Sequence, residues 1–237
     1  LPMWLSIILV LVLTVVLGVV IERVAYKPLR SSPRMSVMIS AIGVSYLLQN
    51  CALYFTGGLP RSYPVIPFLT KSVKIWGATT KMVTVVTPIL TILLVIVLVL
   101  LIKYTKIGMA MRAVSKDFET SQLMGIKINS VISFTFVIGC FLAAVGSMLY
   151  FSNYTSVIPT SGAMPGLKAF VAAVFGGIGS IPGAVIGAFI IGICENIIRS
   201  FGQDWTVFSD AFTFVLLIVV LLVKPTGIFG EKATDKV

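Results

Sequence analysis

The sequence contains no histidine and few charged residues. Of its 237 residues 11% are charged and 58% are apolar, a composition outside the range of soluble globular domains. Without histidine, a Ser-His or Cys-His nucleophilic pair and an imidazole metal site are excluded. The three cysteines, Cys51, Cys140 and Cys194, lie in apolar runs and have neither zinc-site spacing nor the even number of a disulfide framework. The composition therefore indicates a membrane protein and argues against soluble hydrolytic chemistry.

Acidic residues are also scarce, with 8 Asp and Glu against 18 Lys and Arg. The basic residues gather in the connections between apolar runs, which is typical of loops on the cytoplasmic face of a membrane. We therefore expect no nucleic-acid partner. No Gly-x-x-x-x-Gly-Lys-Ser/Thr loop occurs in the sequence, so we expect that the chain does not hydrolyse ATP itself. We expect no bound cofactor and no metal.

Long uncharged runs predict helices that cross a bilayer, which requires about 20 residues. Four runs are long enough: 3–21, 35–59, 82–102 and 128–151. A fifth run, 205–223, begins at Trp205, an expected interfacial anchor, and ends before Lys224 and Pro225. The connection 60–81 is rich in proline and polar residues and predicts an external loop with short strands.

The chain begins with Leu1, and no basic leader precedes the first apolar run. We therefore expect a fragment whose N-terminal spans are missing. No linker of low complexity divides the sequence, which predicts a single membrane domain over 1–237.

The region between the fourth and fifth runs is interrupted by glycine and proline. Its break contains Gly176, Gly177, Gly179, Pro182 and Gly183, through which a continuous helix is not expected. If 165–198 enters and leaves the membrane on one side, twelve basic residues share one face and six the other, whereas a single crossing gives ten and eight. A helix from Pro165 to Gly176 would reach only about 18 Å. These patterns predict an all-α, polytopic transmembrane bundle with a broken, re-entrant pair of short glycine-rich helices.

Small residues recur four apart at Gly179, Gly183 and Gly187, a spacing that predicts close helix packing in lipid. The helix that starts near Pro182 would also point its amides at an anionic group, but a purely structural hairpin explains the pattern with fewer assumptions. Isolated polar residues are further candidates for the translocation path: Gln49, Asn50, Glu195, Asn196 and Asp210. The amides could equally bond between helices, and both acids lie near predicted span ends.

The stretch 108–127 predicts a short amphipathic helix. Its apolar stripe is Ala110, Val114 and Phe118, and its polar face includes Arg112, Lys116 and Glu119. Two interpretations compete: a helix that lies in the membrane interface, and a ridge that docks into a groove of a soluble partner.

Four stretches together resemble the permease subunit of bacterial branched-chain amino acid ABC importers: 22–30, 39–45 with Gln49 and Asn50, 108–125 and 166–187. Within the third, Glu119 and Gly125 stand in register with the pattern Glu-Ala-Ala-x-x-x-Gly of ABC permeases, and Thr120 and Ser121 replace the two alanines. The resemblance implies that this loop binds an ATPase subunit. The coupling residues that it implies are Arg112, Lys116, Asp117, Glu119 and Gly125.

The resemblance further implies a set of partners in the bacterial inner membrane: a second permease, two ATP-binding cassette subunits and a periplasmic or extracellular solute-binding protein. The implied substrates are leucine, isoleucine and valine, and similar permeases import urea or short amides. An ion-coupled secondary transporter is a second hypothesis, but it needs a titratable group in mid-span, which the sequence does not show. A membrane-embedded enzyme ranks last, because histidine and paired acidic residues within a span are lacking.

Overall fold

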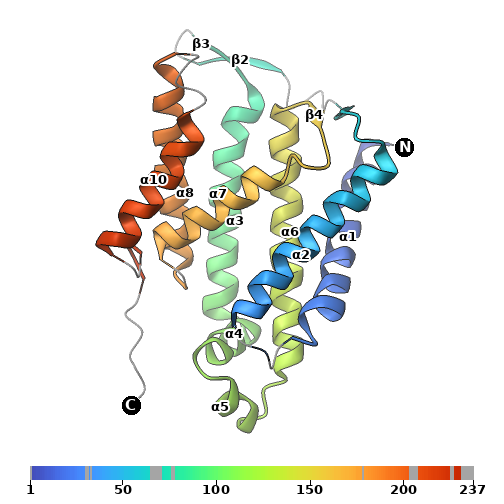
Figure 1. Ribbon diagram of the computed structural model, residues 1–237, viewed down its shortest axis with the longest axis vertical. Coiled ribbons are helices and arrows are strands. Elements are labelled where there is room, and N and C mark those ends of the chain that lie inside the picture. The colour runs from blue at the N-terminus through green and yellow to red at the C-terminus, as the bar shows by residue number, and fades with distance from the viewer. Residues whose placement is uncertain are drawn as a thin grey trace. The chain divides into compact units, whose positions relative to one another are not determined.

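The structure is a computed structural model that describes residues 2–29, 32, 34–64, 71–75, 78–177, 179–202, 208–224 and 227–230. It divides into two compact units, Leu1–Pro159 and Thr160–Val237. Most of the described residues are helical (Figure 1), which confirms the predicted all-α class.

The first unit consists of helices and four short strands. Its helices are α1 (Met3–Ile21), α2 (Arg34–Thr56), α3 (Met82–Tyr104), α4 (Lys106–Lys116), α5 (Phe118–Leu123) and α6 (Ile128–Asn153). A π-helical segment, η1 (Glu22–Tyr26), continues α1. Its strands are β1 (Arg61–Ser62), β2 (Ser72–Ile75), β3 (Ala78–Lys81) and β4 (Ser156–Val157).

Three of the predicted spans are confirmed as helices that are long and apolar enough to cross a bilayer: α1 with η1, α3 and α6. None of the residues in the most apolar 18-residue stretch of α3 is buried within the protein. An apolar helix with so little protein cover has lipid as its natural solvent. The run predicted over 35–59 forms α2, a helix of 23 residues, and its crossing of the membrane stays a prediction.

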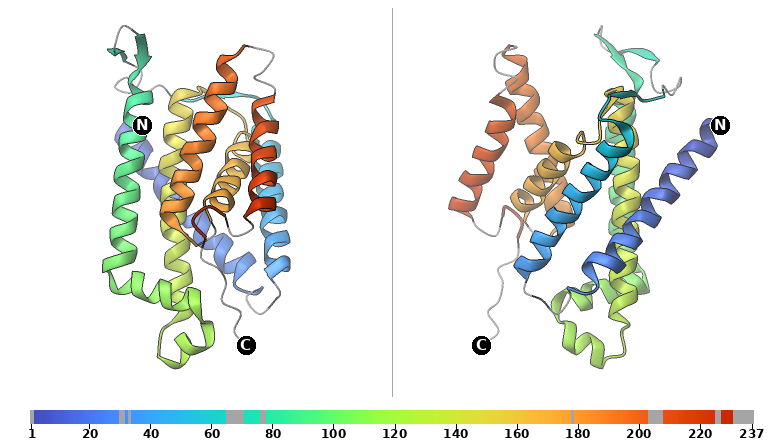
Figure 2. Two further views of the ribbon diagram at one scale, coloured as in Figure 1. Left: turned by 90° about the vertical axis from the view of Figure 1, so that its left-hand side faces the viewer. Right: turned by 45° about the vertical axis from the view of Figure 1, so that its right-hand side comes forward.

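The two ends of the first unit differ in structure. At one end β2 and β3 form an antiparallel hairpin and β1 pairs with β4, so the short strands expected in 60–81 are confirmed. The remaining part of that connection, including Pro67 and Trp76, lies outside the described residues. At the other end lie α4, α5 and the turn after η1, while α3 and α6 run side by side between the ends (Figures 1 and 2). Arg23 and Lys27 thus lie at the same end of this unit as the basic connection 103–127.

Helices α1 and α6 approach closely at a glycine. Gly18 is buried, and a Cβ at this position would lie 2.1 Å from Sγ of Cys140. The small residue at Gly18 lets the two helices pack closely, which is how helices associate where lipid removes the hydrophobic driving force.

The second unit contains α7 (Ala163–Gly176), α8 (Ile181–Ser200) and α10 (Phe208–Val223). The predicted break between two helices is present, and α7 is short, with 14 residues. By contrast α8 has 20 residues and could cross a bilayer, so the prediction of two short helices is wrong for the second one. The reason is that Pro182 falls in the first turn of α8, where proline is tolerated, and nothing interrupts the helix afterwards.

The fifth predicted run forms α10 from Phe208 onward. The anchor expected at Trp205 and the tail residues Lys232 and Lys236 lie outside the described residues. The core of the second unit is built around Val171, Ala172, Phe175 and Ile191. Side chains of α10 and Ile228 pack against it.

Glycines bring α7 and α8 into backbone contact as an antiparallel pair. A Cβ on Gly176 would lie 2.1 Å from the carbonyl oxygen of Gly183, and one on Gly187 would lie 2.6 Å from the carbonyl oxygen of Ala172. A Cβ on Gly192, further along α8, would meet no atom within 4 Å. Gly192 therefore lies off the face of α8 that contacts α7.

We predict that Gly176→Ala lowers the free energy of unfolding by about 1–3 kcal/mol, because the added methyl group collides with backbone that cannot move aside. Gly192→Ala is the matched control in α8, and it should leave stability unchanged or raise it by up to about 1 kcal/mol, since alanine favours helix. Thermal unfolding of the purified chain in detergent measures both. Equal melting temperatures for the two variants would contradict the close packing.

Candidate functional site

One hydroxyl group and one glycine fix the sharp turn between α3 and α4. Oγ1 of Thr105 accepts a hydrogen bond of 3.0 Å from the Gly108 amide and so caps α4. Gly108 is buried, and a Cβ there would lie 2.3 Å from the carbonyl oxygen of Ile102. Arg112 donates a hydrogen bond of 3.3 Å to the carbonyl oxygen of Lys103. The start of α4 is thereby fixed to the end of α3.

A second cap separates α4 from α5. Asp117 is extended, and its Oδ1 accepts hydrogen bonds from the amides of Glu119 at 3.1 Å and Thr120 at 3.2 Å. The prediction of one amphipathic helix with a stripe through Phe118 is therefore wrong, because an aspartate that caps the next helix ends the preceding one. Val114 in α4 is buried, whereas Phe118 in α5 is 55% exposed.

Gly125 ends the turn after α5. Its φ is +80°, a backbone conformation that favours glycine, and its amide donates to the carbonyl oxygen of Gln122 at 3.0 Å. The backbone conformation at Gly125 therefore explains why the Glu-to-Gly pattern ends in glycine. Four residues, 124–127, join α5 to α6.

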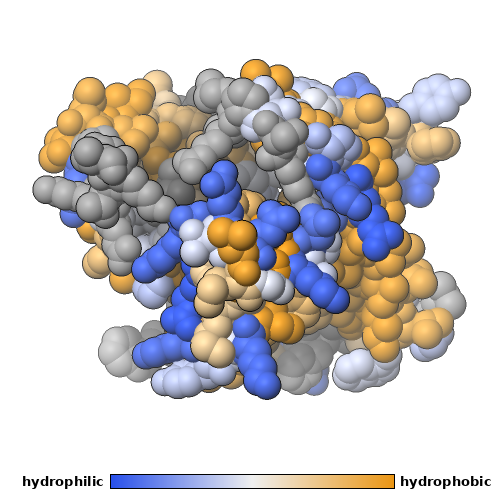
Figure 3. Space-filling view, turned by 90° about the horizontal axis from the view of Figure 1, so that it is seen from below, coloured by the Kyte–Doolittle hydropathy of each residue, from blue (hydrophilic) through white to orange (hydrophobic). Residues whose placement is uncertain are grey.

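The predicted coupling residues share the α4–α5 region with exposed apolar side chains. Arg112, Lys116 and Glu119 are exposed. Leu123 and Met124, which were not among the predicted site residues, are 88% and 79% exposed. From below, apolar surface lies among hydrophilic residues (Figure 3). The sequence signal was present, since large apolar residues at the polar end of a helix predict a contact surface.

The predicted path amides form hydrogen bonds within their own helices. Gln49 donates to Oγ of Ser45 at 3.2 Å, and Asn50 donates to the carbonyl oxygen of Tyr46 at 2.8 Å. Asn196 donates to the carbonyl oxygen of Gly192 at 2.8 Å.

Glu195, by contrast, belongs to an ion-pair network that joins α7, α8 and α10. Nζ of Lys168 lies 2.6 Å from Oε1 of Glu195 and 2.6 Å from Oδ1 of Asp210. Arg199 also pairs with Glu195, one turn along α8. The side chains of Lys168 and Glu195 are only 21% and 13% exposed.

Sequence reasoning missed Lys168 and Arg199 as partners of the two acids. One signal was available, because Glu195 and Arg199 stand four apart on a helix. The other partner comes from a different helix, which spacing along the chain does not reveal. Two acids and two bases make the network neutral, as charges within membrane helices require.

The glycine break is covered by its own surroundings. Gly177 and Gly179 have φ of +108° and +98°, and a Cβ on Gly177 would lie 2.3 Å from the Gly230 amide nitrogen. A Cβ on Gly179 would meet no atom within 4 Å, so this glycine shapes the turn and does not belong to the packing face. Oγ of Ser180 accepts a hydrogen bond of 3.2 Å from the Gly183 amide, which is therefore occupied.

Among the described residues, no group of three or more Cys, Asp and Glu side chains gathers that could hold a metal ion. The described residues include an exposed α4–α5 pair at one end of the first unit and a glycine-packed helix pair in the second. These features define a polytopic membrane protein of the permease class.

Comparison with known proteins identifies the family. Residues 1–221 match the model of the branched-chain amino acid transport system permease component. The chain is 40% identical to the high-affinity branched-chain amino acid transport system permease protein LivH of Salmonella typhimurium and of Escherichia coli K12, over 92% of this chain and 71% of each relative. It is 38% identical to BraD of Pseudomonas aeruginosa, over 96% of this chain and 74% of that protein. No solved structure matches the chain with significance. The chain belongs to this permease family.

We predict that Lys168→Met lowers the free energy of unfolding by about 1–3 kcal/mol, because Asp210 and Glu195 lose the cation that they share inside the helix bundle. Lys74→Met removes one exposed cation from β2 and serves as control, with an expected change within about 0.5 kcal/mol. Melting temperatures of the chain in detergent compare the variants. If both variants melt like the unchanged protein, the network does not hold the three helices together.

Proposed function

We propose that the chain is the transmembrane permease subunit of an ATP-binding cassette importer that carries leucine, isoleucine and valine across the bacterial inner membrane. The names of its relatives support this substrate class. The observation that carries the proposal is the α4–α5 pair, which exposes charged side chains together with an apolar tip formed by Leu123 and Met124. That combination suits a protein groove better than lipid alone, because Arg112, Lys116 and Glu119 are exposed and differ in charge sign.

In this proposal two ATP-binding cassette subunits serve the importer, and one of them binds α5. A displacement of α5 reaches α6 through the short connection 124–127, and α6 contacts α1 at Gly18 and Cys140. The capped turn at Thr105 transmits the same displacement to α3. Nucleotide binding would then bias the equilibrium between outward and inward access. A second permease completes the path, and an external solute-binding protein delivers the substrate.

Charge reversal at the tip tests the proposal. We predict that Glu119→Lys reduces ATP-driven leucine uptake and co-purification of the ATPase subunits at least tenfold, because an exposed ion pair across the interface becomes a repulsion. The melting temperature of the isolated chain should stay unchanged, since Glu119 is exposed.

Lys74→Glu on β2 is the matched control, because it reverses an exposed charge at the opposite end of the first unit.

Uptake by the unchanged importer should persist with an uncoupler while ATP is held constant. Uptake that collapses with the proton gradient would instead favour an ion-coupled transporter. Retention of urea in place of leucine by the partner binding protein would change the substrate class and leave the coupling mechanism in place.

We also propose that α7 and α8 form a re-entrant pair. With 14 residues α7 spans about 21 Å, short of the roughly 30 Å hydrocarbon core. The antiparallel contact between Gly176 and Gly183 returns the chain toward the side from which it came. The charge bias of the loops supports the same topology.

Cysteine labelling tests this topology in a variant whose three native cysteines are replaced. We predict that Thr160→Cys and Ser200→Cys, before α7 and at the end of α8, both react with a membrane-impermeant maleimide added outside spheroplasts. Ser115→Cys in α4 should react only after the membrane is opened. Labelling of Thr160→Cys and Ser200→Cys from opposite sides would show a single crossing.

A further inference from the structure

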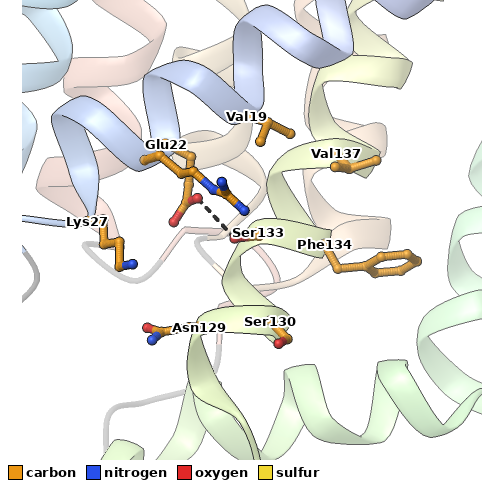
Figure 4. Close-up of a pocket in the computed structure, with 9 residues that line it drawn as sticks. Val19, Glu22, Lys27, Asn129, Ser130, Ser133, Phe134 and Val137 are labelled. Atoms are coloured by element: carbon orange, nitrogen blue, oxygen red, sulfur yellow. Dashed lines mark hydrogen bonds between the residues drawn. The ribbon is translucent and has the colours of Figure 1, made fainter.

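A cavity of about 540 Å³ lies between the end of α1 with η1 and the beginning of α6. Its lining includes six polar residues: Glu22, Arg23, Lys27, Asn129, Ser130 and Ser133. Val19 and Val137 contribute to an apolar part (Figure 4). The proposed transport mechanism does not use this cavity.

The polarity of the cavity changes along the helix axes. In the close-up Lys27, Asn129 and Ser130 lie toward one side, and Val19 and Val137 lie toward the other (Figure 4). Eight residues separate Val19 from Lys27 and also Asn129 from Val137, which corresponds to about 12 Å along a helix. The polar residues stand at the ends of two predicted spans, where headgroups lie, and the valines stand deeper in the hydrocarbon.

The charges of the cavity are arranged so that cations face outward. Arg23 in η1 and Lys27, the residue that follows η1, are both exposed, and both line the cavity. Glu22 is only 1% exposed, and its Oε2 accepts a hydrogen bond of 2.9 Å from Oγ of Ser133. The buried carboxylate leaves the lining with one net positive charge, which matches a phosphodiester that carries one negative charge.

We propose that this cavity binds one anionic phospholipid. Arg23 and Lys27 hold the phosphodiester, the polar side chains of Asn129 and Ser130 contact the headgroup, and an acyl chain lies along Val19 and Val137. Basic pockets between membrane helices at the interface select anionic headgroups. A small soluble anion would satisfy the cations but would leave the valine wall empty, so the lipid accounts for both parts of the cavity. The bound lipid fills the gap between α1 and α6.

Native mass spectrometry of the purified chain tests the proposal. The chain is transferred from micelles that contain equal amounts of phosphatidylglycerol and phosphatidylcholine, and the ratio of the two single-lipid adducts is measured. Each cation near a headgroup contributes about 1 kcal/mol, so the unchanged chain should favour phosphatidylglycerol by at least about fivefold. Arg23→Gln with Lys27→Gln should bring the ratio close to one.

Two further variants distinguish lipid binding in the cavity from attraction of lipid to surface charge in general. Lys103→Gln with Lys106→Gln removes the same charge from exposed positions at the same end of the first unit and should keep the fivefold preference. Val137→Phe keeps both cations but fills the apolar wall, and it should lower the phosphatidylglycerol adduct at least threefold. Circular dichroism checks that each variant keeps its helix content, and the single variants Arg23→Gln and Lys27→Gln provide the test if the double variant does not fold.

Three outcomes would overturn the proposal. The first is an unchanged lipid ratio in the variant without Arg23 and Lys27, and the second is an equal loss in the variant without Lys103 and Lys106. The third is release of the lipid by millimolar glycerol 3-phosphate or leucine, which would assign the cavity to a soluble phosphate or to a solute. Retention of phosphatidylglycerol in the presence of both compounds supports the lipid.

Discussion

The structure depends on one constraint: its helices face lipid, so burial of apolar side chains supplies little attraction between them. The most apolar stretch of α3 has no buried residue, and the apolar side chains buried in the described part of the chain are few. Close backbone approach and internal polar bonds must therefore hold the helices together. Glycines provide the approach, at Gly18 against α6 and at Gly176 against Gly183. Polar bonds add specificity, as in the contact of Ser133 with Glu22.

The same constraint explains why the α4–α5 pair is the part of the first unit best suited to receive a signal. It lies beyond the ends of the apolar spans, so its side chains meet water and can select a protein partner by charge and shape. Its own geometry is fixed by two helix caps, from Thr105 and Asp117, and by the turn at Gly125. A force applied to α5 therefore moves the adjoining spans instead of deforming the pair. Binding energy at the tip can in this way change the packing of helices that the partner never touches.

The sequence was informative where one physical pattern dominates and less so where contacts join distant residues. The apolar runs predicted α1, α3 and α6 because no competing signal interrupts them, and the glycines predicted the end of α7. The separation of α4 from α5 was missed because helical periodicity continues across Asp117, while its side chain caps the following helix. The length of α8 was missed because Pro182 was interpreted as part of a break, although it lies in a first turn. Lys168 was missed because its partners lie on other helices, and that placement follows from tertiary packing alone.

Charge is used in two ways within this chain, and the difference follows from the cost of an uncompensated charge in lipid. In the second unit the charges are paired: Lys168 and Arg199 stand against Glu195 and Asp210, with Glu195 and Lys168 mostly covered. In the first unit Arg23, Lys27, Arg112 and Lys116 are exposed at one end, where water and headgroups compensate them. Paired charges determine which helices stay together, so their loss acts on stability. Exposed charges add little to stability and are available to a headgroup or to a protein surface, so their loss acts on what the protein binds.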